Sequence, residues 1–251
     1  MLLGPPFVDI SAATTLLQSG ATVLDTRAAT AYLAGHIPGA VRVDWKAATV
    51  GGPLSGTLGA PDAVAAYYAG LGVDSSRPVL VAGAWANAWG EEGRVAWDLA
   101  WLGHTDVHVL EGGMPGWTGK RERLPTRVVP GKLVARERPE LRITTEALVA
   151  ALASDAPPVV IDVRDPDEFE GARKFRESRG GHIPGARNIP WKTLFAGPPD
   201  IPQDTPLIVY CTGGVRSGMA WAALTAHGYT VANNDGSWWA WARTQPAPEE
   251  P

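Results

Sequence analysis

The hexapeptide Gly-His-Ile-Pro-Gly-Ala occurs twice in this chain, at residues 35–40 and again at residues 181–186. Each copy is preceded by a short apolar run that ends in Asp-x-Arg, at residues 23–27 and 160–164. Because the order of these motifs and their chemistry repeat together, the pattern indicates an internal duplication. The duplication predicts two related domains.

A second pair of matching segments lies further along each half. The apolar runs at residues 79–82 and 207–210 each follow a proline, as buried strands often do. A loop that contains glycine follows each run, and we expect helices after these loops, roughly at residues 94–102 and 217–227. Strands that alternate with helices predict an α/β fold of two tandem domains, each a parallel sheet flanked by helices.

The repeat also sets the domain boundaries. We expect the first domain at residues 1–120 and the second at residues 140–251, joined by a basic linker at residues 121–139. The linker is rich in arginine and contains prolines, so we interpret it as a solvated connection. The alternative is that some of its arginines fold over the interface between the domains and help to attract anions.

Composition excludes several classes of protein. The chain has 251 residues with 45% hydrophobic and 19% charged residues and a net charge of -4, which favours a globular protein over a binder of nucleic acid or of an anionic membrane. No apolar run is long enough for a membrane span, and residues 1–17 lack the pattern of a secretory signal. The single cysteine excludes an internal disulfide and a multi-cysteine metal site. We therefore expect a cytoplasmic protein without a metal or nucleotide cofactor.

That single cysteine lies where chemistry is expected. Residues 207–218 read Leu-Ile-Val-Tyr-Cys-Thr-Gly-Gly-Val-Arg-Ser-Gly, which predicts a buried strand, a tight loop and then a helix. Ligands of open α/β sheets bind beyond the carboxyl ends of the strands, and a helix N-terminus and Arg216 both favour a thiolate. We interpret Cys211 as the nucleophile rather than as a small buried apolar residue. The residues expected to line its loop are Thr212, Gly213, Gly214, Val215 and Arg216.

Together, the duplicated hexapeptide, the Asp-x-Arg segments, the cysteine loop and the closing Gly-Ser-Trp at residues 236–238 resemble the rhodanese superfamily over nearly the whole chain. The layout is similar to thiosulfate and mercaptopyruvate sulfurtransferases, which have an inactive first domain. The resemblance implies that Cys211 takes sulfane sulfur from an anionic donor as a persulfide and passes it to cyanide or a thiol. A thioredoxin-like or other thiol protein is a candidate acceptor, and the loop after Cys211 would cradle the persulfide. In the first half, Gly83 stands where Cys211 does, so we expect no nucleophile there.

Two departures from the family pattern leave the donor open. Thr212-Gly213 matches neither the two cationic residues typical of thiosulfate-type members nor the Gly-Ser of mercaptopyruvate-type members. Glu168 stands where a donor-binding arginine is usual, and a carboxylate there would repel an anion. Compensating charge could come from the insertion at residues 172–180, whose arginines are the candidate donor-binding residues: Arg173, Arg176 and Arg179.

Other functions and roles remain as alternatives. A phosphatase or arsenate reductase on the same fold would need Cys-x5-Arg, whereas four residues separate Cys211 from Arg216. A sulfur-relay module that receives a persulfide from a partner protein would use the same loop. Asp162, Arg164 and His182 all have counterparts in the half without cysteine, so we expect structural roles for them, with His182 as a hydrogen-bonded anchor of its loop.

Overall fold

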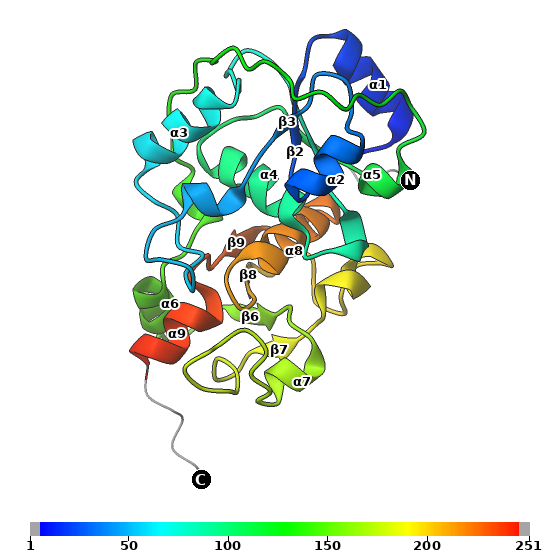
Figure 1. Cartoon of the computed structure of the whole chain (residues 1–251). Helices are drawn as coiled ribbons and strands as arrows, with labels where there is room; N and C mark the ends of the chain where they lie inside the picture. The colour runs from blue at the N-terminus through cyan, green and yellow to red at the C-terminus, as the bar shows by residue number, and fades with distance from the viewer. Residues whose placement is uncertain (1–5, 246–251) are drawn as a thin grey trace. The chain divides into compact units, whose positions relative to one another are not determined.

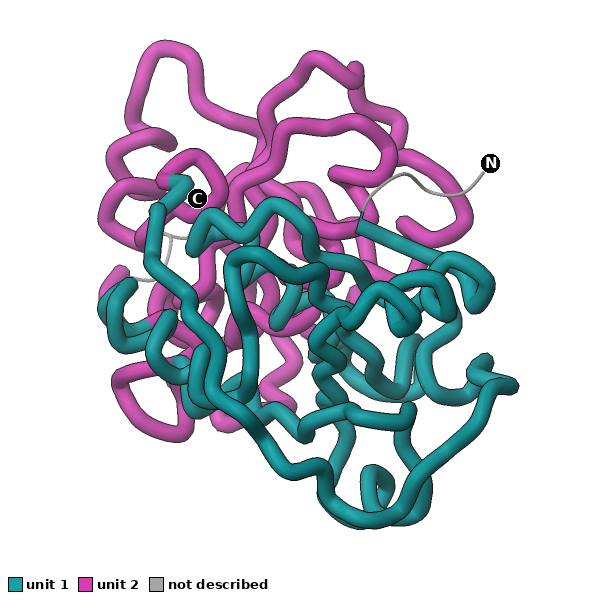
Figure 2. Tube along the Cα trace, turned by 90° about the horizontal axis from the view of Figure 1, so that it is seen from above, with its two compact units in different colours: residues 1–48, 59–138 teal, residues 49–58, 139–251 magenta. Residues whose placement is uncertain are grey.

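Short apolar runs bounded by glycine and proline form the strands, as their pattern predicts. The computed structural model describes residues 6–245, and all neighbouring strands in it run parallel. The chain divides into two units (Figure 2). Unit 1 consists of the residues up to Ala48 together with Gly59–Arg138, and unit 2 consists of Thr49–Leu58 together with the residues from Pro139 onward. A segment from the first half of the sequence therefore belongs to the second unit.

Unit 1 contains a five-stranded sheet in the order β1-β5-β4-β2-β3. Its elements, labelled in Figure 1, are β1 (Phe7–Val8), α1 (Ile10–Gln18), β2 (Thr22–Asp25), α2 (Ala29–Ala34), β3 (Val41–Arg42), η1 (Trp45–Ala48), α3 (Pro61–Gly70), β4 (Val79–Ala82), η2 (Trp85–Asn87), α4 (Glu91–Trp101), β5 (Val107–Leu110) and α5 (Gly113–Gly116). The central strands β2 and β4 are almost wholly buried, which is the expected burial for a parallel sheet covered on both faces.

Unit 2 repeats this arrangement with four strands in the order β7-β6-β8-β9. Its elements are η3 (Pro139–Leu141), α6 (Thr145–Leu152), β6 (Val159–Asp162), α7 (Pro166–Phe169), β7 (Arg187–Asn188), η4 (Trp191–Phe195), β8 (Leu207–Tyr210), α8 (Val215–Ala226), β9 (Val231–Asn233) and α9 (Ser237–Thr244). At the edge where unit 1 has β1, unit 2 has a single parallel bridge between Arg142 and Asn233. The two sheets confirm the predicted α/β fold.

The two faces of the unit 2 sheet carry different helices. Helices α6 and α9 lie side by side in Figure 1, and their residues Leu148 and Trp238 join Val160 and Tyr210 of the sheet in one apolar core. Helix α8 packs against β8 and β9, and η4 packs against α8. Cys211 directly follows β8 in the middle of the sheet, so packed elements hold its loop on both sides.

The helices after the central strands begin earlier than the sequence pattern predicts. We expected starts near residues 94 and 217, but α4 begins at Glu91 and α8 begins at Val215. The reason is the residue before each helix, because Gly90 (φ 78°) and Gly214 (φ 82°) both adopt the left-handed conformation and end the loop there. Two matching caps thus place the two helices alike.

The duplicated Asp-x-Arg motif builds the same structure in each unit. The guanidinium of Arg27 donates to the Asp25 carboxylate at 2.6 Å and to the carbonyl of Gly35 at 2.8 Å. Arg164 donates in the same way to Asp162 at 2.6 Å and to the carbonyl of Gly181 at 2.8 Å. The motif therefore ties the end of a strand to the first glycine of the duplicated hexapeptide.

The duplicated histidines anchor the same loops. His36 contacts the carbonyl of Tyr32 through Nδ1 at 2.9 Å and stacks on its ring, with 3.9 Å between centroids. His182 contacts the carbonyl of Phe169 at 2.9 Å and stacks on the ring of Phe169, with 3.7 Å between centroids. These contacts confirm the predicted hydrogen-bonded anchor.

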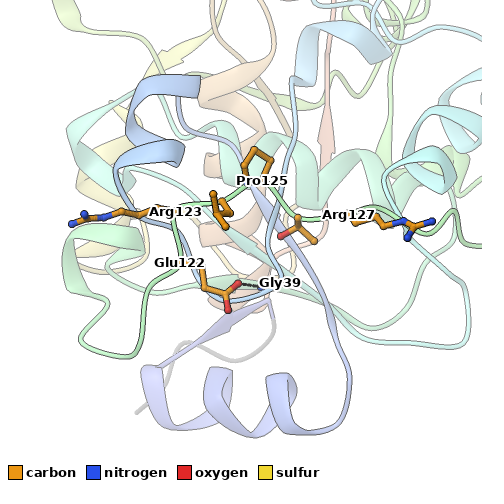
Figure 3. Close-up of a pocket in the computed structure, with 7 residues that line it drawn as sticks. Gly39, Glu122, Arg123, Pro125 and Arg127 are labelled. Atoms are coloured by element: carbon orange, nitrogen blue, oxygen red, sulfur yellow. Dashed lines mark hydrogen bonds between the residues drawn. The ribbon is translucent and has the colours of Figure 1, made fainter.

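The predicted linker runs along unit 1 and exposes most of its side chains. It lines a shallow hollow of about 490 Å³ with Gly39, whose N–H donates to Glu122 at 3.3 Å (Figure 3). The side chains of Arg123 and Arg127 point away from each other there. These two arginines therefore do not converge on an anion site in the hollow. Within residues 6–245, no helix has both the length and the apolar character needed to cross a membrane.

Candidate active site

Cys211 begins a tight loop between β8 and α8, and its sulfur is held from two sides. The N–H of Gly214 donates to Sγ at 3.1 Å, and the hydroxyl of Ser217, in the first turn of α8, donates to it at 3.7 Å. The cysteine is only 2% exposed. Both donors favour a negative charge on the sulfur, and so does the positive end of α8.

The electrostatic surroundings shift the thiol toward its ionised form. Burial by itself raises the pKa of Cys211, but the charge of Arg216 and hydrogen bonds from Ser217 and the loop backbone outweigh it, so the pKa lies below its ordinary value. A larger fraction of the sulfur is therefore thiolate at neutral pH than in a free cysteine.

A strained serine supports the start of the loop. Ser237, in the closing Gly-Ser-Trp, is fully buried and adopts φ 50°, which is unusual for a residue with a side chain. Its hydroxyl accepts a hydrogen bond from the N–H of Cys211 at 3.1 Å and donates to the carbonyl of Asn234 at 2.7 Å. Sequence reasoning missed both Ser217 and Ser237, although each lies within a segment that drew attention for other residues.

Glu168 does not act as the sequence pattern suggested. We expected its carboxylate to face the donor and repel it, but the side chain is fully buried and accepts hydrogen bonds from Arg216 at 2.6 and 2.7 Å and from Thr212 at 3.0 Å. Arg216 also donates to the hydroxyl of Thr212 at 2.7 Å. Burial raises the pKa of Glu168, but the contacts with Arg216 and Thr212 lower it further than burial raises it. Glu168 therefore joins both ends of the cysteine loop.

The insertion at residues 172–180 packs on the loop through an aromatic residue. Arg216 lies over the ring of Phe175, 5.5 Å from its centroid, and the carbonyl of Phe175 accepts a hydrogen bond from the indole of Trp239 at 3.0 Å. Arg173 and Arg176 stand on either side of Phe175 in the sequence, and both are exposed. Arg179 has a different role, because its guanidinium lies over Trp238 at 4.8 Å. The structure thus separates the three candidate donor-binding arginines into two exposed residues and one that packs.

Three carboxylates at the start of α7 lie close together, namely Asp165, Asp167 and Glu168. Lys174 pairs with Asp167 at 2.7 Å and lies 3.7 Å from Asp165, while Arg216 pairs with Glu168. Cationic side chains of the protein therefore already neutralise this cluster.

Unit 1 has lost more than the nucleophile at the corresponding position. Glu92 follows the cap Gly90 by two residues, as Arg216 follows Gly214, so the charge there is reversed. The carboxylate accepts a hydrogen bond from the N–H of Trp85 at 2.7 Å, and a side chain added at Gly83 would overlap with it. A cysteine at Gly83 would therefore have neither space nor a cation.

Glu92 also gives unit 1 a stability that depends on pH. Burial raises the pKa of Glu92 from 4.5 to about 7, and its Oε2 has no hydrogen-bond partner among residues 6–245. A raised pKa means that the folded state binds the proton more tightly, so this stability is complete below pH 4.5 and is lost as the pH rises through about 7.

We expect Glu92→Gln to remove this loss. The free energy of unfolding of the variant minus that of wild type should therefore be up to about 3 kcal/mol more favourable above pH 7 than at pH 4. Urea unfolding of both proteins at several pH values measures it, with Glu91→Gln as the control. A difference between wild type and Glu92→Gln that stays constant with pH would contradict the assignment.

With this geometry established, three comparisons identify the class of protein. The family model for the Rhodanese-like domain matches residues 10–120 and 144–244. A thiosulfate sulfurtransferase of Corynebacterium glutamicum is 30% identical in an alignment that covers 87% of this chain and 81% of the relative. The chain therefore belongs to the rhodanese-like domain family and carries the domain twice.

Other relatives cover most of the chain as well. The sulfur carrier protein TtuD of Thermus thermophilus is 29% identical over 84% of this chain and 83% of its own length. The crystal structure of SseA from Escherichia coli, a 3-mercaptopyruvate sulfurtransferase, matches with a TM-score of 0.77 and 26% identity over 93% of this chain and 98% of that one. The names of these relatives differ in the sulfur donor or in the role that they state.

Proposed function

We propose that Cys211 is the nucleophile of this sulfurtransferase and carries sulfane sulfur as a persulfide from a small anionic donor to cyanide or a thiol. The protein is an enzyme of the thiosulfate or 3-mercaptopyruvate sulfurtransferase type, as its family and its full-length relatives indicate. The observation that carries the assignment of Cys211 is its buried sulfur, which accepts hydrogen bonds from Gly214 and Ser217 beside Arg216 and has a lowered pKa.

The transfer has two balanced steps. The thiolate of Cys211 attacks the outer sulfur of thiosulfate, the S–S bond of the donor breaks, and sulfite leaves with the bonding electrons. With 3-mercaptopyruvate the C–S bond breaks instead, and the carbon that keeps the electrons takes up a proton to give pyruvate. Cyanide or a thiolate then attacks the terminal sulfur and restores the Cys211 thiolate. The hydrogen-bond donors around Sγ, Gly214 and Ser217, stabilise the negative charge on the sulfur in each step.

The donor must be attracted by charges other than that of Arg216, because Glu168 binds that guanidinium on two sides. Arg173 and Arg176 are both exposed and stand in the sequence on either side of Phe175, whose ring contacts Arg216. We assign the attraction of the anionic donor to these two residues, and we assign Arg179 a packing role on Trp238.

Thiocyanate formation from cyanide tests the proposal, with thiosulfate and 3-mercaptopyruvate as alternative donors. We expect turnover with at least one donor, a persulfide on Cys211 in the mass spectrum, and the loss of both in Cys211→Ser. Arg176→Ala should raise KM by about threefold at low salt, as one exposed charge does, whereas Arg187→Ala should not. A Cys211→Ser variant that retains turnover would overturn the assignment.

A sulfur-relay function is the second candidate, and two observations favour it. The relative from Thermus thermophilus is named a sulfur carrier protein, and Arg216, whose charge lowers the pKa of Cys211, is already paired with Glu168. Persulfide uptake from a protein donor without turnover of either small donor would support the relay. A phosphatase is disfavoured because the Cys-x4-Arg loop is one residue short and Arg216 is bound by Glu168.

A further inference from the structure

We propose that Gly56, from the first half of the sequence, is a positioning residue for the sulfur of Cys211 because it fixes the peptide that donates to that sulfur. The inference rests on the proposed function of Cys211 for its catalytic consequence, although the contact itself does not depend on it. Gly56 lies in Thr49–Leu58, which belongs to unit 2 even though the sequence repeat places it in the first domain (Figure 2).

The segment Thr49–Leu58 forms a closed loop. An antiparallel bridge joins Thr49 to Leu58, and the N–H of Val50 donates to the carbonyl of Thr57 at 2.8 Å. Ser55, at the inner side of the loop, is 5% exposed and accepts a hydrogen bond from the N–H of Thr57 at 3.2 Å. These internal contacts hold the loop in one conformation, so anchoring the loop also fixes the position of Gly56.

The rest of unit 2 holds this loop at two places. The N–H of Leu58 donates to the buried carboxylate of Asp235 at 2.7 Å, and Arg142 contacts the same carboxylate at 3.1 Å. Near the middle of the loop, Arg243 donates to the carbonyl of Leu54 at 2.9 Å. Asp235 directly precedes the Gly-Ser-Trp that supports Cys211, so the loop is anchored beside the cysteine.

Between these anchors, Gly56 packs against the carbonyl of Gly213 so closely that an added methyl group would overlap with it. That carbonyl belongs to the same peptide group as the N–H of Gly214, which donates to Sγ of Cys211 at 3.1 Å. In a trans peptide the C=O and N–H point in opposite directions. Gly56 therefore supports the peptide from the side opposite to the sulfur.

The other contact of Gly213 comes from α9. A side chain added at Gly213 would overlap with the ring of Trp239, so this residue is enclosed by the indole as well as by Gly56. Glycine is thus required in both segments that form the contact, at Gly56 and at Gly213. Because Gly56 is not in the left-handed region, an alanine there is excluded by space alone.

Gly56→Ala is the direct test. The methyl group should displace the Gly213–Gly214 peptide and weaken its hydrogen bond to the thiolate, which raises the pKa of Cys211. We expect the pH midpoint for alkylation of Cys211 by a small reagent to rise by about one pH unit, with persulfide formation slower by up to about tenfold at neutral pH. Gly197→Ala is the matched control, because an added methyl group meets nothing within 4 Å there.

The alkylation midpoint separates this inference from the proposed function. A midpoint that rises in Gly56→Ala supports the inference even if wild type forms no persulfide, a result that would count only against the proposed function. A folded Gly56→Ala with an unchanged midpoint would overturn it. If Gly56→Ala does not fold, Arg243→Ala serves instead, because it removes the hydrogen bond to the carbonyl of Leu54 and loosens the loop. The alkylation midpoint must then rise by a smaller amount in Arg243→Ala for the inference to stand.

Discussion

Glu168→Ala should lower the free energy of unfolding of unit 2 by about 3–5 kcal/mol, because it removes the carboxylate from a buried guanidinium. Arg216 is 3% exposed and Glu168 is fully buried, so water cannot replace the lost partner without opening the loop. Thr212 loses an acceptor at the same time. Both ends of the cysteine loop are released, and sulfur transfer should fall with stability. Calorimetry and the thiocyanate assay, run on the same preparation, measure the two losses.

Two further variants separate charge from structure at this position. Glu168→Gln keeps the shape but removes the negative charge that offsets Arg216, so the pKa of Cys211 should fall further and its alkylation midpoint should move to lower pH. The exposed Glu170→Ala is the control for the loss of a carboxylate nearby. If Glu168→Ala and Glu170→Ala unfold alike, the buried pair does not hold the loop.

The fold follows from local signals that repeat in the sequence. The apolar runs and the glycine-containing loops after them are short-range patterns, and in both units they correspond to a strand followed by a turn into a helix. The start of α4 was predicted too late because Gly93 interrupts the helical pattern of its first turn, which reads Glu-Glu-Gly. The helical state of these residues depends on the left-handed cap Gly90 and on packing against the sheet.

The cysteine loop was equally local, whereas its supports are not. Strand, cysteine, glycines and arginine are consecutive, so periodicity and spacing suffice to find them. Glu168 reaches Arg216 across 48 residues, and Gly56 reaches Gly213 from the first half of the chain. No periodicity connects such positions, and a glycine against a carbonyl leaves no chemical signature in a sequence. The position of Glu168, where the family usually has a donor-binding arginine, also led to a wrong prediction, because its carboxylate binds Arg216 instead of facing the donor.

Asp162→Ala should destabilise unit 2 by about 3–5 kcal/mol, and Asp25→Ala should destabilise unit 1 by less. Asp162 and Arg164 are both almost wholly buried, whereas the side chain of Arg27 is 11% exposed and can regain some hydration when Asp25 is removed. Each carboxylate also accepts the N–H of the arginine at 3.0 Å, so the turn after the strand should loosen in both variants. Urea unfolding of wild type and of both variants measures the loss of stability.

The comparison between these two variants decides what the duplicated pair does. Unit 1 keeps the pair without any cysteine, so a structural role requires Asp162→Ala to retain most of its sulfur transfer per folded molecule at low temperature, with an unchanged alkylation midpoint. A catalytic role would instead appear as a large loss of transfer in folded Asp162→Ala that Asp25→Ala does not share. Because Arg164 donates its hydrogen bonds to Asp162 and to the carbonyl of Gly181, we expect a structural role, with sulfur transfer per folded molecule largely retained in Asp162→Ala.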